Sequence, residues 1–347
     1  METRVAIVTG GLRGLGRAMA FGLARQGHEV LAVGHIDADV AEIEREAASS
    51  GLADRLCPLV ADLRRTAECD RIVAATQAQF GPVDILVNNA GLTFTYIDPP
   101  RFRRPTIQRF WEVGDDIVEN VIATNYLAGD RLARRVAPGM VARGWGRIVN
   151  VTTKLDTMNR AGTHPYGASK AALEMATEVW AKETEGTGLT INIVNPGAGA
   201  NTPGMAEEMR AMSRDGRAAR LVEPDEMVPP LLYVVSREAD QVNGYRFDAN
   251  LWDAALPPVE AAKRAGRPAG FVMHPAIILA IRMAIAQRAD SRGTGQHRRS
   301  PRAAPRTGQM HSNWKPGYSP LAIRPRLTVK SPFSHRIFQL VEPVSVA

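Results

Sequence analysis

The chain has 347 residues, of which 45% are hydrophobic and 23% are charged, an ordinary composition for a globular protein. This composition excludes a wholly disordered, collagen-like or disulfide-stapled protein. The net charge of +7 is unevenly spread, because residues 288–347 hold 11 basic and 2 acidic residues and leave residues 1–287 at −2. The two cysteines, Cys57 and Cys69, are too few and too close for a disulfide framework, which favours unpaired thiols and a cytoplasmic location.

Neither a signal peptide nor a membrane helix is expected. The short apolar run at residues 5–8 passes directly into glycines, which is not the pattern of a signal peptide. The most apolar late stretch, residues 276–286, is about eleven residues long and contains Arg282, whereas a membrane-spanning helix needs about twenty.

Short β-branched runs alternate with longer helical patterns through most of the chain. The strands read as nearly continuous apolar runs, which is typical of a parallel sheet covered on both faces. We therefore predict an α/β fold with a doubly wound, mostly parallel, Rossmann-like sheet and right-handed crossovers. Strands are predicted at residues 5–8, 30–33, 56–60, 85–87, 147–151, 190–194 and 244–247, and helices at residues 15–26, 38–49, 66–80, 115–143, from 166 and after 224.

The composition changes after Pro268, and after residue 288 arginine and proline interrupt every hydrophobic period. A segment of this kind has too few large apolar residues to form a packed core. We predict one domain over residues 1–270, a short helix or linker at 271–287, and a disordered basic tail at 288–347.

Three glycines, Gly10, Gly14 and Gly16, follow the first predicted strand and open the first helix. Glycine lets the backbone turn sharply and approach a pyrophosphate, whose charge then meets free N–H groups at a helix N-terminus. The position between a strand and a helix favours dinucleotide binding over a purely structural turn.

The spacing of this turn, with Thr9 before the first glycine, resembles the TGxxxGxG motif of the short-chain dehydrogenase/reductase family. Over about residues 4–250 the resemblance implies a single-domain oxidoreductase that transfers hydride between a nicotinamide cofactor and a carbonyl or secondary alcohol. It also implies a homodimer or homotetramer paired through the long helix and the helix that bears the tyrosine. The further motifs follow in the family's order, at residues 88–91, Asn125, Tyr166 with Lys170, and residues 195–197.

Charge at the cofactor site favours NADP over NAD. The position at which the family places an acidic residue to bind the ribose is Gly34 here, followed by His35, so nothing repels a 2′-phosphate. Arg13 occupies a position where NADP-preferring members commonly carry a basic residue, and a guanidinium suits a phosphate. The alternative is a solvated Arg13, with Asp37 binding the ribose. Asp62 resembles the family's adenine contact, and its alternative role is a helix N-cap.

The resemblance implies a set of cofactor contacts spread over several loops. The family often has threonine at position 201, where this chain has Asn201, and the neighbouring Thr202 is the residue we assign. The predicted contacts are Thr9, Gly10, Arg13, Gly14, Leu15, Gly16, His35, Asp62, Asn89, Gly91, Tyr166, Lys170, Pro196, Gly197 and Thr202.

The predicted catalytic pair is Tyr166 and Lys170, which are four residues apart and share one face of a helix. An adjacent ammonium favours the phenolate, so the phenol can exchange a proton near neutral pH. The resemblance places Thr153 on the substrate oxygen, where the family usually has serine, with Thr152 as the alternative donor. It also implies that Asn125 holds a water on the lysine. We assign no metal site.

The substrate region departs from the family. Residues 92–109 are longer and more basic than expected, with Arg101, Arg103, Arg104 and Arg109. This segment either attracts an anionic substrate or is a solvated loop or subunit contact, and the sequence favours the latter two. His164 is interpreted mainly as a loop residue. Three methionines at helical spacing suit an apolar lid or ordinary packing: Met205, Met209 and Met212.

Two other functions stay open at this point. One is a 3-oxoacyl-thioester reductase, for which the basic residues near Arg101 would meet an acidic carrier. The other is a non-catalytic protein that senses the cofactor or binds nucleic acid through the basic tail. An intact Tyr166 and Lys170 spacing argues against the second, so we do not expect a nucleic-acid partner.

Overall fold

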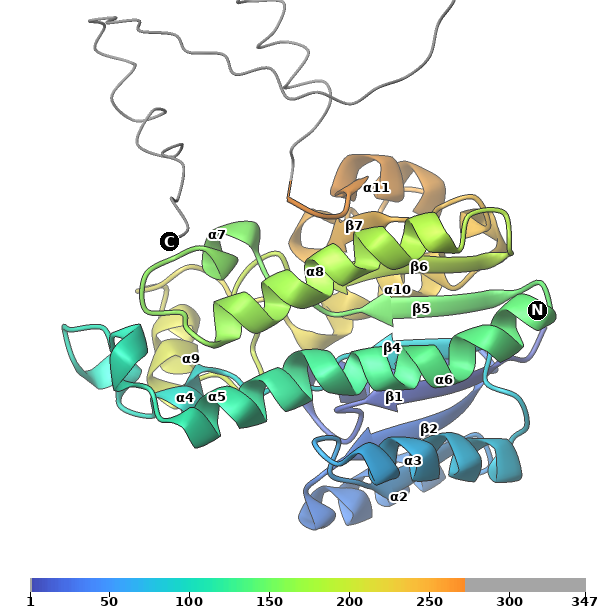
Figure 1. The fold of residues 1–347 in the computed structure, drawn as a ribbon, viewed down its shortest axis with the longest axis horizontal. Helices are drawn as coiled ribbons and strands as arrows, with labels where there is room; N and C mark the ends of the chain where they lie inside the picture. Colours follow the sequence, from blue (N-terminus) through green and yellow to red (C-terminus); the bar gives the residue numbers. More distant parts are fainter. Residues whose placement is uncertain (1, 272–347) are drawn as a thin grey trace, which may run out of the picture. The chain divides into compact units, whose positions relative to one another are not determined.

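The computed structural model describes residues 2–271. Its centre is one eight-stranded sheet in the order β3-β2-β1-β4-β5-β6-β7-β8, parallel throughout except for β8 (Figure 1). This confirms the predicted α/β fold. The predicted tail lies outside the described residues, as does the predicted linker beyond residue 271. The strands are β1 (Val5–Thr9), β2 (Glu29–Gly34), β3 (Leu56–Val60), β4 (Ile85–Asn88), β5 (Gly146–Asn150), β6 (Leu189–Asn195), β7 (Tyr245–Asp248) and β8 (Gly266–Pro268).

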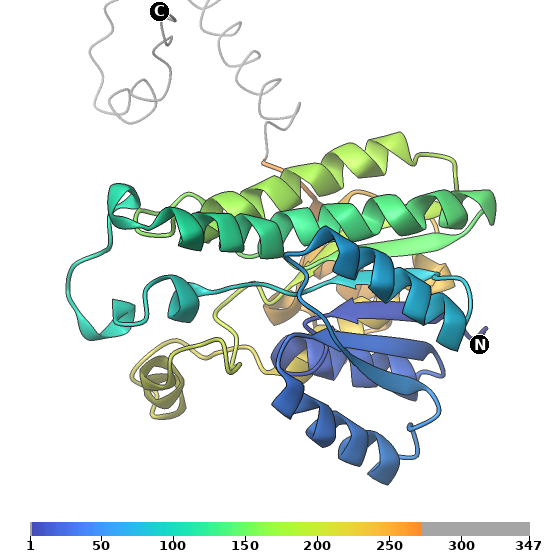
Figure 2. The same cartoon turned by 60° about the horizontal axis from the view of Figure 1, so that its bottom comes forward.

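Helices cover both faces of the sheet, and each face has its own apolar core. One core joins α1, α2, α10 and α11 to the sheet, and the other joins α3, α6 and α8 to the opposite face (Figure 2). The helices are α1 (Gly14–Arg25), α2 (Val40–Ser49), α3 (Thr66–Gln79), α4 (Phe94–Ile97), α5 (Asp115–Ile122), α6 (Ala128–Ala142), α7 (Leu155–Met158), α8 (Tyr166–Glu183), α9 (Glu207–Arg214), α10 (Val228–Val234) and α11 (Pro258–Ala265).

The strand order reverses between β1 and β4. The chain builds β1, β2 and β3 outward in one direction, then returns to place β4 on the other side of β1. The loops that leave the carboxyl ends of β1 and β4 therefore diverge and leave a crevice between them. In open α/β sheets this switch point is where ligands bind.

Several elements differ from the prediction, including the short helices α4 and α7, which were not predicted. The helix predicted at residues 115–143 is interrupted by a π-helical turn at Ala123–Leu127, which separates α5 from α6. Helix α11 and strand β8 were not predicted. The three residues of β8 are too short to show a period, and the strand forms because it pairs with β7 at the sheet edge, where Pro268 is tolerated. Across residues 2–271, no helix has the length and apolarity needed to cross a bilayer.

Candidate active site

A cavity of about 1,100 Å³ opens at the carboxyl ends of the strands and is lined by the loops that follow β1 to β6. It brings together most of the predicted site residues. Four of them, Thr9, Gly16, Asn125 and Gly197, do not line the cavity. Those that do line it are Gly10, Arg13, Gly14, Leu15, His35, Asp62, Asn89, Gly91, Thr153, Tyr166, Lys170, Pro196 and Thr202.

The glycine turn after β1 is locked to the loop after β4. The Asn89 side chain donates to the carbonyl oxygens of Thr9 at 2.9 Å and Gly10 at 3.3 Å. The Thr9 hydroxyl accepts from the backbone N–H groups of Asn89 at 3.0 Å and Ala90 at 3.1 Å. A Cβ at Gly16 would overlap the Gly10 carbonyl, so only glycine fits there. Thr9 and Gly16 therefore fix the shape of the turn without lining the cavity. The turn residues that do line it include Gly10 and Gly14.

The end of β2 has no room for an acidic side chain. A Cβ at Gly34 would lie 2.7 Å from the Leu12 side chain, so the packing of Leu12 requires glycine at this position. Arg13 lines the cavity and faces Asp39, with Nε 3.9 Å from the carboxylate. Asp37 does not line the cavity. The carboxylate nearest the predicted phosphate position is therefore Asp39, which sequence reasoning missed.

Asp62 is held by its neighbour Arg64. Two guanidinium nitrogens donate to the two carboxylate oxygens at 2.9 and 2.8 Å, and this pairing lowers the pKa of Asp62. The N-cap of α3 is Arg65, so the alternative role of Asp62 as that cap is wrong. Arg64 also lines the cavity and was not predicted, although its place two residues after Asp62 was a usable signal.

The predicted catalytic residues meet where β5 and α8 approach each other. Tyr166 begins α8, Lys170 lies one turn later, and Thr153 follows β5. The Tyr166 phenol and Thr153 both line the cavity, and the Thr153 side chain acts to lower the pKa of the phenol. Thr152 instead donates to the buried Glu174 carboxylate at 2.8 Å, which rules it out as the donor in this arrangement.

Burial shifts the pKa values of Tyr166 and Lys170 toward their neutral forms. Desolvation raises the pKa of the Tyr166 phenol, and the Thr153 side chain opposes this only in part. Desolvation lowers the pKa of Lys170 to about 8. The expectation that Lys170, helped by an oxidised nicotinamide, lowers the phenol pKa stays a prediction, and in the protein without ligand the net shift of the phenol pKa is upward. The physical reason is that burial disfavours the charged form of each group.

Lys170 and Asn125 flank Gly91. The Lys170 ammonium donates to the Val151 carbonyl oxygen at 2.8 Å. The Asn125 side chain, in the π-helical turn, bonds Leu92 N–H at 2.7 Å and Leu92 carbonyl at 3.1 Å. A Cβ at Gly91 would lie 3.4 Å from both Asn125 Oδ1 and Lys170 Nζ. The Asn125 side chain thus positions the loop. That Asn125 also holds a water on Lys170 stays a prediction.

The low pKa of Lys170 predicts a pH-dependent stability difference. The folded-state pKa is about 8, against an ordinary value of 10.5, so between these values the folded protein binds fewer protons than the unfolded chain. Stability of the wild type relative to Lys170→Met should therefore rise with pH across this window, by about 3 kcal/mol. Urea unfolding of both proteins from about pH 7 to about pH 10.5 measures it, and a difference independent of pH would contradict the burial of a charged lysine.

The loop after β6 closes the cavity on the substrate side. Thr202 and Met205 line the cavity, whereas the Asn201 side chain is bound to Glu223 at 2.9 Å. Thr202 is therefore the residue that faces a ligand. Met209 of α9 also lines the cavity, as an apolar lid requires, and Met212 does not. His164, outside the cavity lining, packs its ring edge against Phe110.

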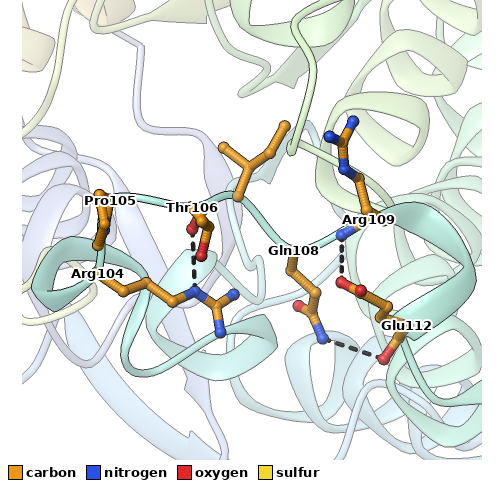
Figure 3. A pocket seen from close by; sticks show the side chains of 7 residues that line it. Arg104, Pro105, Thr106, Gln108, Arg109 and Glu112 are labelled. Atoms are coloured by element: carbon orange, nitrogen blue, oxygen red, sulfur yellow. Dashed lines mark hydrogen bonds between the residues drawn. The ribbon is translucent and has the colours of Figure 1, made fainter.

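A second hollow, of about 810 Å³, lies within the loop at residues 104–112 (Figure 3). Its residues bond mainly to one another, and Arg104 also donates to Asp98 outside the loop at 2.7 Å. The Arg104 guanidinium donates to Thr106 carbonyl at 3.1 Å, and Arg109 N–H donates to the Glu112 carboxylate at 2.7 Å. These bonds satisfy polar groups of the loop. The residues that line the hollow therefore form no cluster of polar groups directed at a ligand.

A sequence profile of the short chain dehydrogenases matches residues 4–213. The chain belongs to this family. Nodulation protein G of Azospirillum brasilense is 32% identical over 255 residues, which cover 72% of this chain and 98% of that protein. The 3-oxoacyl-[acyl-carrier-protein] reductase of Vibrio cholerae is 31% identical over 253 residues, covering 72% and 97%. Among solved structures, a variant of actinorhodin polyketide ketoreductase with NADPH matches with a TM-score of 0.59 and 28% identity, covering 70% of this chain and 93% of that one.

As a short-chain dehydrogenase, the protein is an oxidoreductase of a family that uses a nicotinamide cofactor. The described residues fit such a group. The glycine turn is packed so closely that side chains are excluded at Gly16, and the turn opens into α1, whose first N–H groups face the cavity beside Gly14 and Leu15. Backbone N–H groups at a helix N-terminus suit a pyrophosphate.

Proposed function

We propose that this protein is an NADP(H)-dependent reductase of a carbonyl group in a small molecule, with Tyr166 as the general acid. The observation that carries the proposal is that Tyr166 and Thr153 line the same cavity, with the buried Lys170 one helical turn from Tyr166. The cofactor, when bound, supplies the hydride. The protein supplies the proton and the position of the substrate oxygen.

Each side chain has a separate task in this mechanism. The hydroxyls of Thr153 and Tyr166 bind the carbonyl oxygen, and as negative charge develops there Tyr166 gives its proton to that oxygen. The Lys170 ammonium then stabilises the phenolate that remains. Asn125 positions the loop at Leu92 beside Lys170. A water bound at the π-helical turn that contains Asn125 would return a proton from solvent. The alcohol oxidation is the same path reversed, with the phenolate as base.

The raised pKa of Tyr166 supports reduction as the favoured direction. A phenol whose pKa lies above its ordinary value is protonated at neutral pH and is ready to donate. Oxidation would need the phenolate in the resting protein, which burial disfavours. The pKa of about 8 keeps Lys170 mostly charged at neutral pH, so it can still stabilise the phenolate that reduction leaves behind.

The preference for NADP rests on Arg13, which lines the cavity, and on Gly34, which also lines it and stands where the family places an acidic residue. Arg13→Gln should raise the KM for NADPH by about 10- to 100-fold, because it removes a charge-assisted hydrogen bond to phosphate. The KM for NADH should change by less than about twofold. Steady-state kinetics with both cofactors measures the two changes in KM. Arg25→Gln, at the far end of α1, is the control, and an equal loss with both cofactors would contradict the assignment.

A 3-oxoacyl-thioester reductase is a second candidate, because the Vibrio cholerae relative is named for that reaction. A carrier-bound substrate would place its acidic carrier outside the cavity. Arg103, with a side chain 71% exposed, is a basic group on that outer surface.

We also propose that two copies pair through α6 and α8, which run side by side on one face of the sheet (Figures 1 and 2). Both helices expose large apolar side chains that a single copy leaves in water: Val141 on α6, and Met175 and Val179 on α8. Sedimentation of the full chain tests this pairing. A cytoplasmic location stays a prediction from cysteine usage.

The proposed activity is tested by following nicotinamide absorbance while the full chain meets a panel of ketones, oxo acids and oxo thioesters. Turnover with NADPH that exceeds turnover with NADH supports the proposal. The absence of turnover with every carbonyl and both cofactors would overturn it.

A further inference from the structure

Two arginines line the substrate end of the cavity without an ion-pair partner among residues 2–271. Arg101 comes from the long loop after α4 and Arg160 from the segment after α7. Neither forms a salt bridge, although most other arginines of the loop do: Arg103 pairs with Glu208 at 2.7 Å and Arg104 with the buried Asp98 at 2.7 Å. Asp98, the carboxylate nearest to Arg101 in sequence, is therefore already paired with Arg104.

Arg101 is built into the cavity wall and does not extend into solvent. One of its nitrogens donates to the Gly162 carbonyl oxygen, and its guanidinium lies over the Phe94 ring at 4.3 Å. A guanidinium carries five N–H donors, so most of them stay available. The sequence favoured a solvated loop or a subunit contact for this segment, whereas Arg101 lines the cavity, as the alternative of an anionic substrate requires. The reason is that the loop folds back over Phe94 and directs this one side chain inward.

Arg101 lies close to the predicted proton donor. Phe94 contacts both, with its ring centroid 4.3 Å from the Arg101 guanidinium carbon and 4.9 Å from the Tyr166 ring centroid. The sum of these two distances is the greatest separation that the guanidinium carbon and the phenol ring centre can have. Arg101 and Tyr166 thus both contact Phe94 and line the same part of the cavity.

The local charge is positive. Besides Arg101 and Arg160, the charged groups lining this end are Lys154 and Asp156, which face each other at 3.7 Å. Burial, and then repulsion from Arg160, lowers the pKa of Arg101. Arg101 is half-buried and Arg160 is exposed. Neither has an ion-pair partner among residues 2–271, so an anion that reaches both would gain charge-assisted hydrogen bonds. The apolar part of the same wall comes from Phe94, Ile107, Met205 and Met209.

We propose that the substrate is a short oxo acid, whose carboxylate binds Arg101 and Arg160 while its ketone faces Tyr166 and Thr153. This inference rests on the proposed function and names its substrate class. A thioester of a carrier protein has no anion so close to its ketone, so the arginines favour the free acid over that alternative. Reduction would convert the oxo acid to the hydroxy acid, with one hydride from the cofactor and one proton from Tyr166.

The experiment compares free acids with their methyl esters, which keep the ketone and remove the charge. Acetoacetate and levulinate are each paired with the methyl ester, using the preferred nicotinamide and the full chain. The wild type should favour the acid in kcat/KM by about tenfold or more. Arg101→Met should lower kcat/KM for the acid by about 10- to 100-fold and for the ester by less than about threefold. Arg160→Gln should show the same selectivity with a smaller loss, because Arg160 is exposed.

Arg103→Met is the matched control, because it removes an arginine two residues away that does not line the cavity. It should leave the ratio of acid to ester unchanged. Equal losses for acid and ester in Arg101→Met would mean that Arg101 only holds the loop, and would overturn the proposal. So would a wild type that prefers the esters. Failure of the proposed function itself is distinguishable, since then neither acid nor ester turns over.

Discussion

Replacing Tyr166 with phenylalanine should lower kcat for carbonyl reduction by about a thousandfold. The change removes one hydroxyl, which is the proton donor and half of the pair that binds the substrate oxygen, and general acid catalysis contributes about 10²- to 10⁴-fold. The ring stays against Phe94, so the fold and the cofactor affinity should persist. Stopped-flow or steady-state oxidation of NADPH measures kcat, and calorimetric titration measures cofactor binding.

Tyr233→Phe makes the same chemical change in α10, within the apolar core and away from the cavity. It should leave kcat unchanged. At the second hydroxyl, Thr153→Ser should keep most of the activity and Thr153→Val should lose about 10²-fold, because serine retains the donor and valine does not. If Tyr166→Phe retained activity close to that of Tyr233→Phe, Tyr166 would not be the acid.

Replacing Glu174 with alanine should lower the free energy of unfolding by about 3–5 kcal/mol. Glu174 is fully buried on α8, and its carboxylate accepts from the Arg246 guanidinium at 2.8 Å and the Thr152 hydroxyl at 2.8 Å. Removing the carboxylate leaves the Arg246 cation, itself 1% exposed, with Asp248 as its remaining ion-pair partner. Denaturant unfolding of the two proteins measures the difference.

Glu178→Ala is the control, one turn further along α8. Glu178 pairs with Lys182 at 2.6 Å, but the Lys182 side chain is 71% exposed, and such surface pairs contribute about 0–1 kcal/mol. The double variant Glu174→Leu with Arg246→Met should recover part of the lost stability, because it removes the buried cation together with Glu174 and leaves only Asp248, which is 19% exposed and still accepts from the Asn195 side chain. A loss for Glu174→Ala no larger than that for Glu178→Ala would show that the buried pair is not coupled to folding.

The same pair supports the catalytic centre. Arg246 donates to the carbonyl oxygen of Thr153 at 3.0 Å, so it holds the residue that lines the cavity together with Tyr166. No sequence pattern signalled this contact. Glu174 and Arg246 are 72 positions apart, and each alone is indistinguishable from the charged residues of a solvated helix or strand.

Motifs of closely spaced residues were sufficient to predict those parts of the site that are formed by residues near one another in the sequence. The glycine turn at Gly10, Gly14 and Gly16 and the pairing of Tyr166 with Lys170 depend on one strand-to-helix turn and on one turn of helix, so their residues are within a few positions of each other. The position of Thr153 could be counted back from Tyr166 because the intervening connection has the family's length. These predictions concern local geometry, which a linear pattern can express.

Sequence alone predicted the parallel α/β fold with most of its strands and helices, the family, and the candidate site residues, because these follow from periodicity and from motifs of adjacent residues. Only the tertiary structure decided the raised pKa of Tyr166, the inward direction of Arg101, and the partnership of Glu174 with Arg246. Each of these depends on burial or on contact between distant segments. Desolvation of a charge is set by everything packed around it, and that environment exists only once the chain has folded.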